Sequence, residues 1–174
     1  MESARPWRAP EWLIVIGASF FILVLALSAI WDPTIRWLHF FQAWMYLFTI
    51  AFSLRGSRWG YFIGISAAGL WVYVNLFVTT FFINGLQQLA QWIQTGNLAR
   101  RDLLIAVPAW LSNAVIVAGC LWAYGRMRRA EAADIGRFLL SFALTTGFFA
   151  ADMAICQPRY LGLFRGLLHP RLPW

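Results

Sequence analysis

Five long apolar runs alternate with short polar segments along the chain. The first run, residues 12–31, contains no charged side chain and reaches the roughly 20 residues that a helix needs to cross the hydrocarbon core of a bilayer. The other runs are of similar length, and the five predicted spans are residues 12–31, 37–54, 59–83, 103–124 and 138–156. The pattern predicts an all-α, polytopic integral membrane protein: a single domain, residues 1–174, with a bundle of about five transmembrane helices.

The first apolar run also has features of a secretory signal peptide. Arg5 and Arg8 precede it, and Ala26 and Ser28 have the small side chains of a cleavage site. The apolar residues continue past that site as far as Trp31. We therefore interpret the run as a retained membrane span.

Two further segments are predicted to be amphipathic. Residues 84–97 are too polar to cross a membrane, but residues 85–94 fit a short helix whose apolar face carries Leu86, Leu89, Ala90 and Ile93. Such a helix lies either in the membrane interface or, as an ordinary loop helix, against the bundle. The C-terminal tail, residues 158–174, mixes leucine and phenylalanine with arginine. We expect it to lie along the membrane surface or on a partner.

Composition excludes the usual soluble classes. Hydrophobic residues make up 61% of the chain and charged residues only 12%, far from soluble proteins. The net charge of +7 comes entirely from 14 arginines, which flank the apolar runs and would meet lipid headgroups there. The chain is rich in tryptophan, with 11 residues. Membrane lipids are thus the expected partners, and nucleic acid is not.

The arginines also predict an orientation, because short basic loops are retained on the cytoplasmic side. With five spans and a cytoplasmic N-terminus, eight arginines lie inside: Arg5, Arg8, Arg55, Arg58, Arg126, Arg128, Arg129 and Arg137. Six lie outside: Arg36, Arg100, Arg101, Arg159, Arg165 and Arg171. We expect a multi-pass protein of the plasma membrane or a bacterial-type inner membrane, with its N-terminus in the cytoplasm and its C-terminus outside.

Small residues recur at every fourth position in two of the predicted spans. The third span carries Gly60, Gly64 and Ala68, and the fifth carries Ala143, Gly147 and Ala151. Such stripes let two helix backbones approach closely, which is a principal means of packing in lipid. We expect both stripes to be helix-packing surfaces that face the bundle.

Polar residues form a seam along the second span. His39, Gln42, Tyr46, Thr49 and Ser53 follow one another at spacings of three and four, which places them on one helix face. Asn75 and Asn113 are single amides in the third and fourth spans. These side chains have to face protein or water, and hydrogen bonds between helices account for the asparagines without any further function.

No catalytic or metal-binding constellation accompanies these residues. The sequence has no CxxC pair, no spaced metal ligands and no glycine-rich phosphate loop. His39 has no second intramembrane histidine for haem ligation, because His169 lies in the tail. Cys120 and Cys156 are expected in opposite leaflets, too far apart for a disulfide. The sequence names no cofactor.

Asp152 is the one acidic residue inside a predicted span, about one turn from the outer end of that span. A carboxylate in that environment is costly and is usually kept for a purpose. It shares a face with Ser141 and Thr145, so we expect it to point inward. One interpretation pairs it with a donor such as Gln157 or Arg159, and the other makes it a site for a proton, a cation or a polar substrate.

Three functions are compatible with this sequence. The first is a non-catalytic subunit, assembly factor or scaffold of a membrane complex, joined to other membrane protein subunits or to further copies of itself. The second is a small oligomeric transporter or channel, with a polar pathway along His39, Gln42, Tyr46, Asn75, Asn113 and Asp152. The third, with the fewest candidate residues, is a membrane enzyme or cofactor-binding protein acting on a lipid or a quinone.

Overall fold

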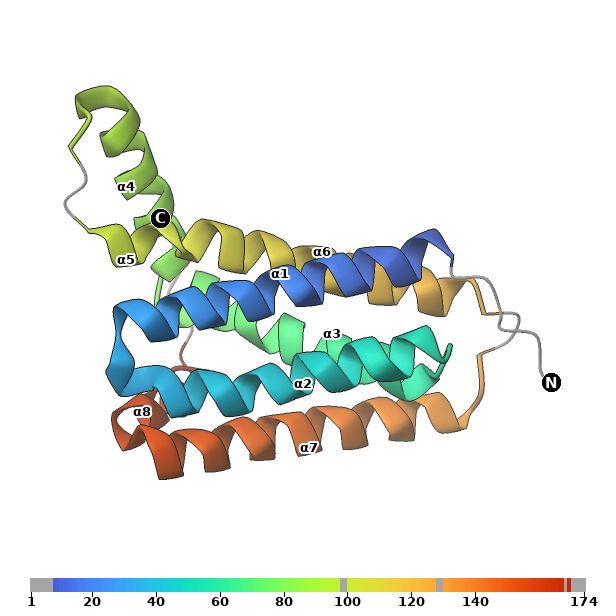
Figure 1. The fold of residues 1–174 in the computed structure, drawn as a ribbon. Helices are drawn as coiled ribbons and strands as arrows, with labels where there is room; N and C mark the ends of the chain where they lie inside the picture. Colours follow the sequence, from blue (N-terminus) through green and yellow to red (C-terminus); the bar gives the residue numbers. More distant parts are fainter. Residues whose placement is uncertain (1–7, 98–99, 128–129, 168, 170–174) are drawn as a thin grey trace.

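The computed structural model describes residues 8–97, 100–127, 130–167 and 169, and all regular elements among them are helical. Five long helices lie alongside one another in a bundle (Figure 1). They are α1 (Ala9–Trp31), α2 (Arg36–Leu54), α3 (Arg58–Tyr73), α6 (Ala106–Gly125) and α7 (Ala133–Cys156). Shorter elements connect them: η1 (Pro33–Ile35), the π-helical turn η2 (Val74–Val78), α4 (Phe81–Thr95), α5 (Arg101–Leu104), η3 (Pro158–Leu161) and α8 (Gly162–Leu167).

Four segments within the described residues are long and apolar enough to cross a membrane. They are residues 9–31, 58–78, 102–125 and 133–156. The expected span in α2 is not among them, so the count of five crossings is not confirmed. The all-helical fold and its membrane character agree with the sequence.

The bundle has two ends, which we name after a residue at each. The Asp32 end carries the turn between α1 and α2, together with α4, α5, η3 and α8 (Figure 1). The Arg58 end carries the turn between α2 and α3 and the connection from α6 to α7. α3 packs against α2, α6 and α7, while α1 packs against α2 and α6. The core is therefore organised around α3.

The third predicted span is broken before its expected end. Its α-helix stops at Tyr73, the π-helical turn follows, and Thr80 has a left-handed backbone with φ of 52°. The expected single helix to residue 83 is therefore wrong, because residues 81–83 begin α4. The Thr79 hydroxyl donates to the Val74 carbonyl over 3.2 Å and accepts from the Phe81 amide over 3.2 Å. These local hydrogen bonds replace those of a continuous helix.

The amphipathic segment forms the longer helix α4, which projects from the Asp32 end of the bundle (Figure 1). It packs against α5 and α6. A side-chain carbon added at Gly85 would come within 2.7 Å of the Leu103 carbonyl oxygen, so only glycine permits this approach. Leu86 and Ile93, from the expected apolar face, remain exposed. α4 is thus anchored near its start, and most of its apolar face is exposed, with only Leu89 of the four expected residues half-buried.

The small-residue stripe of α3 is buried, whereas that of α7 is exposed. Gly60, Gly64 and Ala68 are buried, and a side-chain carbon on Gly64 would lie 2.6 Å from the Cys120 sulfur. Ala143, Gly147 and Ala151 are exposed instead, and no neighbouring atom lies within 4 Å of the corresponding point at Gly147. The expectation that the α7 stripe faces the bundle of its own chain is therefore wrong.

The inward face of α7 explains this correction. Ser141, Thr145 and Asp152 are buried along it, together with Phe149. Polar groups inside a bilayer gain from facing other helices, and α7 cannot bury this face and its small stripe at once. The polar residues determine which face of α7 is buried.

Replacing Thr80 by glycine is expected to stabilise the protein. A β-branched residue with positive φ is strained, by about 1 kcal/mol or more, and glycine adopts the same backbone without that cost. The melting temperature in detergent should rise for Thr80→Gly. Thr95→Gly, within the helical part of α4, serves as the control and should lower it. A lower melting temperature for Thr80→Gly would contradict the assignment of strain.

Candidate functional site

The two faces of α2 reverse the arrangement of a soluble protein. Gln42, Tyr46, Thr49 and Ser53 are fully buried, whereas the opposite face exposes a row of aromatic rings: Trp37, Phe40, Phe41, Trp44 and Phe48. Successive rings in this row are in contact, with centroids 5.3 Å apart for Phe40 and Phe41 and 6.1 Å for Trp44 and Phe48. The polar seam thus points inward, as its spacing predicts, and the apolar face points outward.

A hydrogen bond between two side chains joins the seam to α6. The Tyr46 hydroxyl donates to Asn113 Oδ1 over 2.9 Å, and Asn113 Nδ2 donates to the Ala109 carbonyl over 2.7 Å. Asn75 bonds within its own helical segment, donating to the Trp71 carbonyl over 2.8 Å. A contact between helices therefore accounts for Asn113 but not for Asn75.

Gln42 and Ser53 are the exceptions in the seam, since the buried Ser53 hydroxyl has no hydrogen-bond partner among the described residues. Gln42 is fully buried, yet neither its amide nitrogen nor its amide oxygen has a hydrogen-bond partner among the residues that the structure describes. Leaving such groups unpaired costs about 1–3 kcal/mol each. Gln42 lines a cavity of about 230 Å³ near the Asp32 end, whose wall includes His39 and Asn75 from the predicted site but neither Tyr46, Asn113 nor Asp152. The structure thus brings three of the six predicted polar candidates to one cavity.

His39 is half-buried at the rim of this cavity. Its Nδ1 lies 3.1 Å from the Leu25 carbonyl oxygen. Because a carbonyl only accepts, this contact requires the proton on Nδ1 and leaves Nε2 of the neutral ring as an acceptor. No group of three or more His, Cys, Asp or Glu side chains in the described part of the chain is arranged to hold a metal ion. Cys120 and Cys156 are free thiols.

Asp152 is buried, with 5% of its surface exposed. The Cys156 thiol, one turn further along α7, interacts with its carboxyl group, but neither carboxyl oxygen accepts a hydrogen bond from the described residues. The expected partners bind elsewhere: Gln157 Nε2 donates to the Thr34 carbonyl, and Arg159 Nη2 donates to Thr34 Oγ1 over 3.2 Å. Pairing of Asp152 with Gln157 or Arg159 is therefore wrong.

Thr34 also closes the turn between α1 and α2. Its amide and its hydroxyl both donate to Asp32 Oδ1, over 3.0 Å and 2.6 Å. These two hydrogen bonds hold the pKa of Asp32 below its usual range. Through Thr34, the α1–α2 turn is thus fastened to the end of α7.

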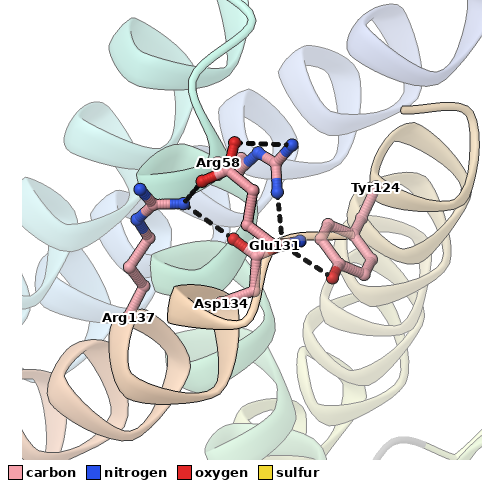
Figure 2. A network of polar contacts seen from close by, with 5 residues as sticks. All are labelled: Arg58, Tyr124, Glu131, Asp134 and Arg137. Atoms are coloured by element: carbon pink, nitrogen blue, oxygen red, sulfur yellow. Dashed lines mark hydrogen bonds and ion pairs between the residues drawn. The ribbon is translucent and has the colours of Figure 1, made fainter. Parts of the chain in front are cut away.

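A charged cluster at the Arg58 end was not predicted from the sequence (Figure 2). Arg58 from α3 contacts Glu131 over 3.1 Å and also pairs with Asp134 at the start of α7. Arg137 contacts Asp134 over 2.8 Å, and the Tyr124 hydroxyl of α6 donates to Asp134 over 3.0 Å. The cluster joins three helices, and Asp134 is its buried centre.

A weak signal for this cluster exists in the sequence. Glu131 and Asp134 are acidic residues within the otherwise basic connection before the fifth span, where orientation alone would favour arginine. Their partner Arg58 is 76 residues away from Asp134, so only the fold reveals the pair.

No protein-family model matches the chain, and no curated protein or solved structure matches it either. The function therefore has to be argued from the residues of this chain.

Replacing Asp134 by alanine is expected to lower thermal stability clearly. The change leaves Arg58, Arg137 and Tyr124 without their shared acceptor, and breaking a buried ion pair costs more than breaking an exposed one. Asp102→Ala is the matched control, because the Arg100–Asp102 pair is solvent-exposed. Unfolding followed in detergent should show a large drop in melting temperature for Asp134→Ala and little change for Asp102→Ala. Equal effects would contradict a structural role for the cluster.

Proposed function

We propose that this protein is a non-catalytic subunit or scaffold of a membrane complex, and that α7 joins it to a transmembrane helix of another chain. The observation that supports the proposal is the exposed small-residue stripe, Ala143, Gly147 and Ala151. Leu140, Leu144 and Ile155 are exposed beside it. Large and small side chains together form a ridge and a shallow groove, into which a second helix fits.

The buried stripe of the same chain shows what such a surface does. At Gly60 and Gly64 the backbone of α3 approaches α2 and α6 so closely that a side-chain carbon would overlap neighbouring atoms at 2.5 Å and 2.6 Å. Lipid chains adapt to any side chain and do not require small ones. Gly147 weakens the helix by up to about 1 kcal/mol relative to alanine, which favours a close helix contact as the reason for its presence.

A fifth crossing through α2 belongs to this proposal. Its 19 residues measure about 28 Å, close to the hydrocarbon thickness of about 30 Å. The row of exposed aromatic rings is the surface that lipid would cover, and the polar residues that lower the mean hydropathy of α2 face inward. With five crossings and Arg55, Arg58 and Arg126 at the Arg58 end, that end is proposed to face the cytoplasm, and the exposed apolar face of α4 to lie in the opposite interface.

The transporter alternative depends chiefly on Asp152. Its buried carboxyl group, which no described residue supplies with a hydrogen bond, supports that alternative. The cavity at the Asp32 end does not include Asp152 or Asn113 in its wall, so the proposed polar pathway is not continuous there. Assembly through α7 has the more direct support.

Replacing Gly147 by leucine is expected to disrupt association without unfolding the chain. The site is open in the single chain, so the unfolding free energy should stay the same or rise by up to about 1 kcal/mol, because leucine favours the helix more than glycine does. Gly64→Leu is the contrasting variant, because it overpacks a closed contact and should cost about 1–3 kcal/mol.

Association would be measured by the mass of the complex after gentle detergent extraction, using two differently tagged copies. The wild type should be recovered in a stoichiometric complex that Gly147→Leu breaks. If both tags co-purify, the partner is a second copy of this chain. If a different membrane protein co-purifies instead, the complex is a hetero-complex. A wild-type monomer, or an unchanged complex in Gly147→Leu, would contradict the proposed role of the stripe.

A further inference from the structure

We propose that the cavity at the Asp32 end binds a small, lipid-soluble molecule with a carbonyl-bearing ring, the chemistry of a quinone headgroup. The cavity lies between the last turns of α1, the first half of α2 and the end of α3, and Met153 of α7 completes part of its wall. It involves no residue of the exposed α7 stripe. The inference therefore goes beyond the proposed assembly role, and either can fail without the other.

The size and the wall of the cavity fit one substituted ring. Its volume of about 230 Å³ lies below the range of about 300–1,000 Å³ that is typical for drug-sized ligands. Phe21, Leu38 and Trp71 contribute apolar surface to the wall. Mostly apolar walls with a few polar groups are the usual composition of a site for a small ligand.

Two polar side chains of the wall have unused hydrogen-bonding groups. Within the described part of the chain, both amide atoms of the fully buried Gln42 are unpaired, and the buried indole nitrogen of Trp71 has no acceptor. The Gln42 amide nitrogen and the Trp71 indole nitrogen are donors. A carbonyl oxygen on the ring of the proposed ligand would accept hydrogen bonds from them. The Gln42 oxygen and His39 Nε2 are acceptors that a ring hydroxyl, as in the reduced form, would satisfy.

Water alone accounts less well for this wall. A volume of about 230 Å³ corresponds to about eight water molecules at roughly 30 Å³ each, and each buried water needs two to four polar partners. The side chains of the wall that carry polar atoms are Ser28, His39, Gln42, Trp71, Asn75, Thr79 and Tyr160. Asn75 already donates to the Trp71 carbonyl, Thr79 to the Val74 carbonyl, and His39 contacts the Leu25 carbonyl. Too few groups remain to hold that much water.

The irregular backbone of the third span borders the same cavity. Asn75 and Thr79 come from the π-helical turn and its end, and Phe81 follows the strained Thr80. π-helical turns often occur at functional sites, and strain persists where the surrounding structure requires it. A continuous α-helix through residues 74–81 would direct these side chains differently. The break thus places them in the cavity wall.

The test uses the full chain in phosphatidylcholine nanodiscs with decylubiquinone as the probe. Binding is followed by quenching of tryptophan fluorescence and by the shift in melting temperature. We expect saturable binding of decylubiquinone and none of decylbenzene, which has the ring and the chain but no oxygen. Gln42→Leu should weaken binding at least tenfold. Ser53→Ala, on the same face of α2 but outside the cavity wall, should leave binding unchanged.

A stability measurement separates this role from a structural one. Without ligand, Gln42→Leu should melt at the same temperature as the wild type or higher, because it removes unpaired buried groups. If that variant fails to fold, Trp71→Phe provides the second test, since it keeps the aromatic surface, removes the donor and should weaken binding severalfold. No saturable binding, equal binding of decylbenzene, or unchanged affinity in both variants would overturn the proposal and leave the cavity to water or lipid chains.

Discussion

The interior of a bilayer provides no water to hydrogen-bond a polar side chain, and the structure of this protein follows from that constraint. In α2, α3, α6 and α7 a face that carries amides, hydroxyls or a carboxyl group points into the bundle, whereas the buried face of α1 is apolar. On α2 the buried face is the polar one and the exposed face is aromatic. On α7 the same constraint turns Ser141, Thr145 and Asp152 inward and leaves the small-residue stripe outside.

Close packing and a charged cluster then fix the arrangement of the helices. Gly60 and Gly64 allow α3 to approach α2 and α6, which places α3 at the centre. At the Arg58 end, Asp134 joins α3, α6 and α7 through charge-assisted hydrogen bonds. At the Asp32 end the third span breaks, and a cavity remains beside Gln42. The two ends therefore differ: ion pairs join the helices at the Arg58 end, next to a cavity of about 560 Å³ lined by charged side chains, and a mostly apolar cavity of about 230 Å³ lies at the Asp32 end.

Much of this organisation follows from periodicity and can be predicted from the sequence. The long helices and the inward seam of α2 depend on local spacing alone. The break at Thr80 depends on side-chain hydrogen bonds of Thr79, which hydropathy does not detect. Two faces of α7 are candidates for burial, the small-residue stripe and the polar face. The spacing of small residues does not indicate which of the two faces is buried. Asp134 and Arg58 meet only through the tertiary fold, and the unpaired state of Gln42 is a property of its surroundings.

The central claim is that α2 crosses the membrane with its polar seam turned inward, and labelling of its two ends tests this directly. Single cysteines would replace Pro33 and Arg55, which are exposed at opposite ends of α2, in a chain whose own Cys120 and Cys156 are changed to alanine. An impermeant maleimide added to intact cells should label Pro33→Cys, and should reach Arg55→Cys only after the membrane is opened. Labelling of both positions from the same side would contradict the account, because α2 would then not cross the bilayer.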